Sequence, residues 1–129
     1  MGFETDESAW PIVRLRWIGT LTDPDVAAEL ARIDGYLARG ERFGLLIDAR
    51  GGGGLSPQQR HRVVAHLKKQ AHLTARFLVQ AAVMDNMIQR TLYYGVNLLV
   101  PSPFPTKVFA EPVAAEEWLG RMLAKPTTA

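Results

Sequence analysis

The chain has 129 residues, of which 47% are hydrophobic and 22% charged, and its formal net charge is +2. It contains no cysteine, which excludes disulfides, thiolate metal sites and cysteine catalysis and fits a reducing cytoplasm. No apolar run has the length of a membrane span, and the acidic first residues differ from a signal peptide. We therefore expect one cytoplasmic domain over residues 1–129, with residues 1–9 forming an edge strand or being flexible and residues 125–129 forming a flexible tail.

Charge is unevenly distributed along the chain. Residues 1–48 carry nine acidic and five basic side chains, whereas residues 49–90 carry seven basic side chains and a single acidic one, Asp85. This basic middle segment predicts one positive face suited to an acidic partner. Its bases are not dense enough to indicate a specific nucleic-acid-binding protein, and docking on anionic lipid is the less favoured alternative.

The first half of the chain alternates between strand and helix patterns. Residues 12–21 alternate apolar and polar side chains, which predicts a strand with one wet face; residues 2–5 are expected to pair with it as an antiparallel edge strand. Apolar residues at helical spacing predict a helix from Pro24 to Arg39, with Asp23 as its N-cap and Gly40 after its end.

The rest of the chain continues this alternation. One apolar stripe predicts a single helix from residue 57 to about residue 75, opened by Ser56 and Pro57. A last amphipathic helix is expected over residues 113–123, with Val113, Trp118 and Met122 facing inward and Leu119 as a further candidate for that face. The other predicted elements are interior strands over residues 43–47 and 77–84, a helix over residues 86–99 and a strand over residues 106–110.

This order of elements predicts an α/β fold. Strands that alternate with helices imply right-handed crossovers and a mainly parallel sheet. We expect a four- to five-stranded, mostly parallel sheet with about four helices.

One candidate binding site is the loop after the strand over residues 43–47. Its candidate residues are Asp48, Arg50, Gly51, Gly52, Gly53, Gly54 and Ser56. Backbone amides of a glycine run beside a helix N-terminus can hold a phosphate, although no Gly-Lys-Ser/Thr follows as in a Walker loop. The simpler interpretation, which we favour, is a mobile connector followed by a serine that caps the next helix rather than one that is phosphorylated.

A second candidate surface, which we rank ahead of the loop, involves Tyr93, Tyr94, Leu98 and Phe104. The helix over residues 86–99 carries two apolar stripes, and a helix that is apolar on two sides is either deeply buried or meets another surface. Core packing alone explains such a pattern. The sharper hypothesis is a contact with a protein partner or with a second copy of the chain.

No pattern in the sequence predicts a metal, a cofactor or catalysis. His61, His66 and His72 are separated by five and six residues, so they cannot form a zinc pair on one helix face. Asp48 and Asp85 both follow predicted strands and could act as an acid–base pair, but each is equally explained as a loop or capping residue. No Ser-His-Asp or Gly-x-Ser-x-Gly arrangement is visible.

Several of these segments together resemble the bacterial SpoIIAA-like proteins, the STAS-like set that also looks like a reduced CRAL-TRIO domain. The resemblance lies in residues 13–22, 45–48, 82–85, 103–109 and 114–119, including Leu45-Leu46-Ile47-Asp48 and Ala82-Val83-Met84-Asp85. It implies a small α/β domain with regulatory or ligand-binding roles more often than catalysis. Anti-sigma-factor antagonists of the wider group carry an Asp-x-Ser strand end and a phosphorylatable serine. Asp48 matches the first of these positions and Ser56 lies in roughly the right place for the serine, whereas Ala49-Arg50, the four glycines before Ser56 and Pro57 after it depart from the pattern.

From the residues and the resemblance we expect a non-enzymatic regulatory module that binds a protein partner or forms a homodimer. The alternative is a small-molecule or lipid-binding domain. An enclosed cavity between the sheet and its helices, lined by residues such as Trp17, Leu46 and Val83, would favour that alternative.

Overall fold

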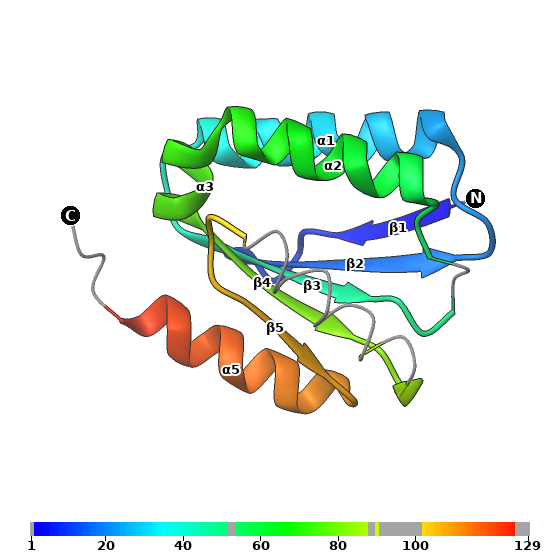
Figure 1. The fold of residues 1–129 in the computed structure, drawn as a ribbon. Coiled ribbons are helices and arrows are strands. Elements are labelled where there is room, and N and C mark those ends of the chain that lie inside the picture. Colours follow the sequence, from blue (N-terminus) through cyan, green and yellow to red (C-terminus); the bar gives the residue numbers. More distant parts are fainter. Residues whose placement is uncertain (1, 52–53, 88–89, 91–101, 126–129) are drawn as a thin grey trace.

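The computed structural model describes residues 2–51, 54–87, 90 and 102–125. In this part of the chain five strands form one sheet, in the spatial order β1-β2-β3-β4-β5 (Figure 1). The strands are β1 (Gly2–Asp6), β2 (Ile12–Ile18), β3 (Phe43–Asp48), β4 (Leu78–Val83) and β5 (Thr106–Phe109). β1 pairs antiparallel with β2, and every other neighbouring pair is parallel. The predicted mostly parallel sheet with an antiparallel edge strand is confirmed.

Helices cover both faces of this sheet. α1 (Asp23–Ala38), α2 (Pro57–Lys69) and α3 (Ala71–Phe77) lie on one face, and α5 (Pro112–Ala124) lies on the other (Figure 1). None of the described helices is both long and apolar enough to cross a membrane. Most of the helix predicted over residues 86–99 lies outside the described residues.

The single helix predicted over residues 57–75 is wrong, because the chain breaks at Gln70. This residue has φ −113° and ψ 30°, which end α2 before α3 begins. Its side chain donates a hydrogen bond of 2.6 Å to Asp34 Oδ1 on α1. The apolar stripe predicted helical structure on both sides of Gln70 but neither the break nor this tie to α1.

α1 starts one residue earlier than predicted, because Thr22 and not Asp23 is the N-cap. The Thr22 hydroxyl accepts a hydrogen bond from Asp25 N, and the Asp25 carboxylate accepts one from Thr22 N, which forms a capping box. Gly40 follows the helix end with φ +69°, as its position predicts.

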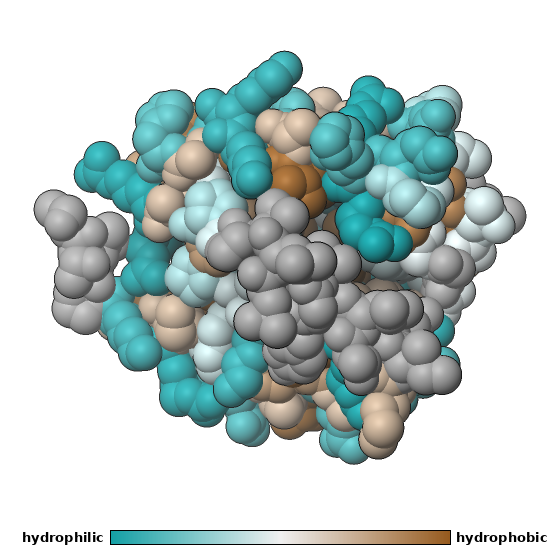
Figure 2. Space-filling view, in the orientation of Figure 1, coloured by the Kyte–Doolittle hydropathy of each residue, from teal (hydrophilic) through white to brown (hydrophobic). Residues whose placement is uncertain are grey.

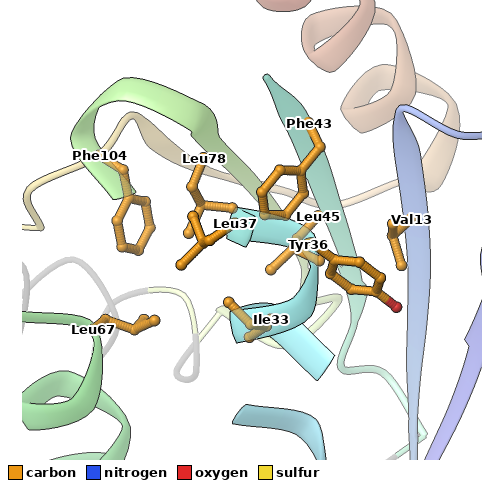
Figure 3. Packing of buried hydrophobic residues seen from close by; sticks show 9 residues of the cluster. All are labelled: Val13, Ile33, Tyr36, Leu37, Phe43, Leu45, Leu67, Leu78 and Phe104. Carbon is orange, nitrogen blue, oxygen red and sulfur yellow. The ribbon is translucent and has the colours of Figure 1, made fainter. Parts of the chain in front are cut away.

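The larger core lies between the sheet and the α1–α2 layer (Figure 3). Its buried members are Val13, Ile33, Tyr36, Leu37, Phe43, Leu45, Leu67, Leu78 and Phe104. Phe104 is 7% exposed, so the expectation that it extends an apolar surface patch is wrong. Its ring fills space beside Leu78 instead (Figure 3).

A second core lies between the sheet and α5. Leu119 and Ala115 of α5 are buried against the side chains of Leu46, Val79 and Val83. Val113, predicted to face inward, is 65% exposed because it lies in the first turn of α5, at the rim of the packed area. α5 packs on β3, β4 and β5, so among the described helices none packs over the part of this face formed by β1 and β2.

Candidate functional site

The open part of the sheet forms a groove of about 420 Å³ beside the first turn of α5. The groove runs over β1, β2 and β3 and is open to solvent rather than enclosed. It is lined by Glu4, Thr5, Asp6, Arg14, Leu15, Arg16, Leu46, Asp48, Val83, Pro112, Val113 and Glu116.

The alternation of β1 and β2 places their charged side chains in this groove. Glu4 is the cross-strand partner of Arg16, and Asp6 is the partner of Arg14. The Arg16 Nε lies 3.6 Å from Glu4 Oε1, and the Arg14 Nη1 lies 3.9 Å from Asp6 Oδ2. Opposite charges on directly paired residues stabilise an antiparallel pair. The wet face predicted for β2 therefore forms one side of the groove.

Arg14 also links the sheet to α5. Its guanidinium lies 2.5 Å from the Glu116 carboxylate, across 102 positions of sequence. Arg14 is therefore shared between Asp6 on β1 and Glu116 on α5. This shared contact fixes the position of the helix beside the open strands.

The floor of the groove is apolar. Leu46 from β3 and Val83 from β4 form it but are only 5% and 0% exposed, so the accessible apolar surface is mainly that of Val113, which stands at the rim with 65% of its surface exposed. An exposed valine beside a depression with an apolar floor is an arrangement that a bound group can cover. The groove thus offers both apolar contact and charges of both signs.

Asp48 ends β3 at one end of the groove and is held by Arg50. The Arg50 Nε and Nη2 donate hydrogen bonds of 2.9 and 2.8 Å to the two carboxylate oxygens, and the Arg50 backbone N donates a third of 3.1 Å. The Arg50 side chain in particular holds the pKa of Asp48 below its ordinary value. Asp48 is therefore ionised and paired at neutral pH.

The structure does not gather the other residues of the predicted loop into this groove. Ser56 caps α2, because its hydroxyl accepts from Gln59 N and its own N–H donates to Gln59 Oε1. The Gly51 carbonyl accepts a hydrogen bond of 3.3 Å from Gly19 N, and Gly54 has φ +80°. Gly52 and Gly53 lie outside the described residues.

The second predicted surface cannot be placed in this structure. Tyr93, Tyr94 and Leu98 lie outside the described residues, and Phe104 belongs to the core.

The histidines of α2 and α3 remain separate. His66 Nε2 lies 2.9 Å from Asp34 Oδ1, which joins α2 to α1. His61 and His72 are exposed. Within the described ranges no three histidine, aspartate or glutamate side chains come close enough to hold a metal ion.

Sequence reasoning missed most of the groove residues. Alternation in residues 12–21 identified the polar face that carries Arg14 and Arg16, and the same alternation continues in Glu4 and Asp6. Opposite charges at positions that pair across two strands were the pattern from which this side of the groove could have been predicted. Glu116 gave no signal, because its contact depends on where α5 packs.

A mostly parallel five-stranded sheet, with helices on both faces and an antiparallel edge strand, defines a STAS-like α/β domain. The chain belongs to the SpoIIAA-like family, since the model of that family matches residues 12–120. A solved structure of an uncharacterised protein with a SpoIIAA-like fold from Shewanella loihica PV-4 is similar, with a TM-score of 0.68 and 20% sequence identity over 92% of each chain. No curated protein matches the chain.

Proposed function

We propose that this protein is a non-enzymatic regulatory module that binds a protein partner through the groove between β1–β3 and α5. The observation that carries the proposal is the open groove itself, with the apolar floor of Leu46 and Val83 and the exposed Val113 at its rim. Protein interfaces combine an apolar centre with a polar rim. Here the ion pairs Arg14–Glu116 and Arg16–Glu4 supply that rim.

The state of the polar side chains supports binding over catalysis. A general acid or base needs a pKa near the working pH and a free position beside the substrate. Asp48 has a lowered pKa, and both of its oxygens are bonded to Arg50. The Ser56 hydroxyl serves as a helix cap. Neither group is arranged as a reactive residue.

The experiment compares two substitutions in the first turn of α5. Val113→Asp introduces a charge into the groove, whereas Ala114→Asp introduces the same charge at the neighbouring exposed position, which does not line the groove. Both carboxylates would lie at a helix N-terminus, so their effects on the helix are matched. The wild-type and variant proteins are used to capture partners from a lysate of the native host, and bound proteins are identified by mass spectrometry.

A partner that binds at the groove is retained by wild type and by Ala114→Asp and is lost with Val113→Asp. Equal recovery of every retained protein by the two variants would contradict a groove-centred contact.

The predicted surface of Tyr93, Tyr94 and Leu98 remains a second proposed contact, for a protein partner or a homodimer. A monomeric mass by light scattering at high concentration would refute its homodimer version.

The groove volume also favours a second candidate function, the binding of a small molecule. About 420 Å³ lies within the range of roughly 300–1,000 Å³ that ligand sites occupy. Leu46 and Val83 line the groove as this alternative requires, but Trp17 does not, and the groove is open. Native mass spectrometry of protein purified from its own host tests the alternative. A bound mass that Val113→Asp removes and Ala114→Asp retains would support it over a protein partner.

A further inference from the structure

The α2–α3 segment presents basic side chains to solvent without any acidic neighbour in sequence. No aspartate or glutamate occurs between residues 49 and 84. The exposed basic or titratable side chains of the segment are Arg60, His61, Arg62, Lys68, Lys69, His72 and Arg76. We call these seven residues the basic face. It lies on the side of the sheet opposite the groove, with α2 and α3 (Figure 1).

The basic face is not neutralised within the described part of the chain. The arginines in ion pairs there are Arg14, Arg16, Arg32 and Arg50, none of which belongs to the basic face. Two acidic side chains of α1 contact α2, and both contacts are to residues outside the basic face: Asp34 is bonded to His66 and Gln70, and Asp23 accepts a hydrogen bond from Gln59. Arg60 donates to the Leu55 carbonyl and Arg76 lies over the Phe77 ring, but no residue of the basic face is in an ion pair with a described carboxylate.

The neighbouring helix adds little negative charge to this layer. α1 and α2 pack side by side, and the exposed residues along the middle of α1 include Ala28, Ala31, Gly35 and Ala38. Its acidic side chains outside the first turn are Glu29, which is buried, and Asp34, which is partly exposed and bonded to His66. The outer surface of the layer is thus basic along α2, and along α1 it is formed by small neutral residues with Arg32 as a further exposed base.

The basic face also lacks an apolar anchor. The large exposed apolar residues of the described chain are Met87 and Val113, and neither lies on α1, α2 or α3. At the top of Figure 2, over the α1–α2 layer, teal hydrophilic side chains project outward, with tan and brown areas between them. A specific protein interface usually has a dehydrated apolar centre. A surface with charges alone is better suited to an extended anionic surface, which it can meet through long-range attraction.

We propose that the basic face docks this protein onto a bilayer that contains anionic phospholipids. Helices with four to eight lysine or arginine residues bind anionic leaflets, with each base contributing additively near the surface. The five lysine and arginine residues of the basic face fall within that range. Because the groove opens on the opposite side of the sheet, it stays accessible when the basic face lies on lipid. This inference is independent of the groove's role.

The test is cosedimentation with vesicles of phosphatidylcholine alone and of phosphatidylcholine with 30% phosphatidylserine. The variant Arg62→Glu/Lys69→Glu reverses two unpaired charges on α2 that are seven residues apart and share one side of the helix. The control Lys107→Glu/Arg121→Glu makes the same change in net charge at exposed positions of β5 and α5. Circular dichroism and thermal unfolding establish that each variant is folded.

We expect binding to the anionic vesicles at 50 mM NaCl, little binding to the neutral vesicles, and loss of binding at 300 mM NaCl as the charges are screened. The α2 variant should bind at least about 30-fold more weakly, since two bases are removed, and the control should bind within a few fold of wild type. Absence of binding to anionic vesicles at low salt would overturn the proposal. Equal weakening by both variants would also overturn it, and so would binding to poly-glutamate or single-stranded DNA but not to vesicles.

Discussion

Glu29 and Arg32 form an ion pair in which the carboxylate is buried and the guanidinium is half exposed. Glu29 is 5% exposed, and its Oε2 lies 3.3 Å from Arg32 Nη1. The other carboxylate oxygen, Oε1, has no hydrogen-bond partner. Burial raises the pKa of Glu29, and the nearby Arg32 only partly opposes this effect. The ionised form of Glu29 is therefore an unfavourable feature of the folded protein.

The first prediction is that Glu29→Gln alters how stability depends on pH. Because the folded state raises the pKa of Glu29, the folded protein holds this proton more tightly than the unfolded chain does. The stabilising contribution of Glu29 is complete below its unfolded pKa and is lost as pH rises through its folded pKa. Wild type should therefore lose stability relative to Glu29→Gln as pH rises from about 4 to 7.

Urea unfolding of both proteins at several pH values measures this difference. The matched control is Glu117→Gln on the exposed side of α5, which should leave the pH dependence close to that of wild type. A difference between wild type and Glu29→Gln that stays constant across the range would contradict the assigned pKa.

The sequence predicted the fold well because each element buries a regular pattern. The apolar runs of β3 and β4 and the alternation of β2 reflect which faces are covered, so they identified the strands and their parallel order. The break at Gln70 was not predictable, because the apolar spacing runs through it and its side-chain contact is with Asp34, on another helix. The spacing of apolar residues along the sequence is the same whether or not such a contact forms, so it carries no information about the break.

The groove was less predictable than the fold for a similar reason. The sequence placed Arg14 and Arg16 on a wet strand face, and Asp48 at a strand end. It could not place Glu116 beside Arg14, since these residues are 102 positions apart. Nor could it show that α5 covers only part of the sheet. The position of α5 on the sheet depends on which side chains of β3 and β4 leave room for Leu119.

The second prediction concerns the ion pair of Asp48 and Arg50. The pKa of Asp48 is lowered, so its contribution to stability is present above its unfolded pKa and is lost as pH falls through the folded pKa. At pH 7 we expect Asp48→Asn to reduce the free energy of unfolding by about 1 kcal/mol, the scale of a partly exposed, bidentate pair.

Chemical denaturation at pH 7 and pH 3 checks this prediction, with Asp85→Asn as the control at the end of β4. The cost of Asp48→Asn should shrink at pH 3, whereas Asp85→Asn should have little effect at either pH. In addition, Arg50→Gln should raise the pKa of Asp48 in a carboxyl NMR titration. An unchanged titration would show that Arg50 does not hold this carboxylate.

The third prediction separates capping from phosphorylation at Ser56. Ser56→Ala removes the acceptor for Gln59 N and should cost about 1 kcal/mol. Ser56→Asp restores an acceptor at the helix N-terminus and should stay close to wild type in stability. Thermal unfolding monitored at 222 nm measures both. If Ser56→Asp were as unstable as Ser56→Ala, the cap would not explain why a serine stands here.

Gln59 should be more sensitive than Ser56. It is 8% exposed, and its Nε2 donates to the Leu21 carbonyl at 2.9 Å and to Asp23 Oδ1 at 3.1 Å. Gln59→Glu replaces these donors with a carboxylate beside two oxygens, which should cost about 2 kcal/mol or more at pH 7. Much of that cost should disappear at pH 4, where the new carboxyl group can become protonated and donate again.

The last prediction tests the position of α5 over β3 with two glycines. A Cβ added at Gly44 would lie 3.0 Å from Leu119 Cδ2, whereas a Cβ at Gly120 would meet nothing within 4 Å. Gly44→Ala should therefore destabilise the protein by about 1–3 kcal/mol through overpacking. Gly120→Ala, inside an exposed part of α5, should stabilise it by about 0.5–1 kcal/mol because alanine favours the helix.

A double variant tests the contact itself. Leu119→Val removes a methylene from the contact and should recover part of the stability lost by Gly44→Ala. The double variant should therefore be more stable than the sum of the two single changes in unfolding free energy predicts. If the changes in unfolding free energy, measured in guanidinium, were strictly additive, Leu119 would not pack against Gly44. The position of α5, and with it the shape of the groove, would then be different.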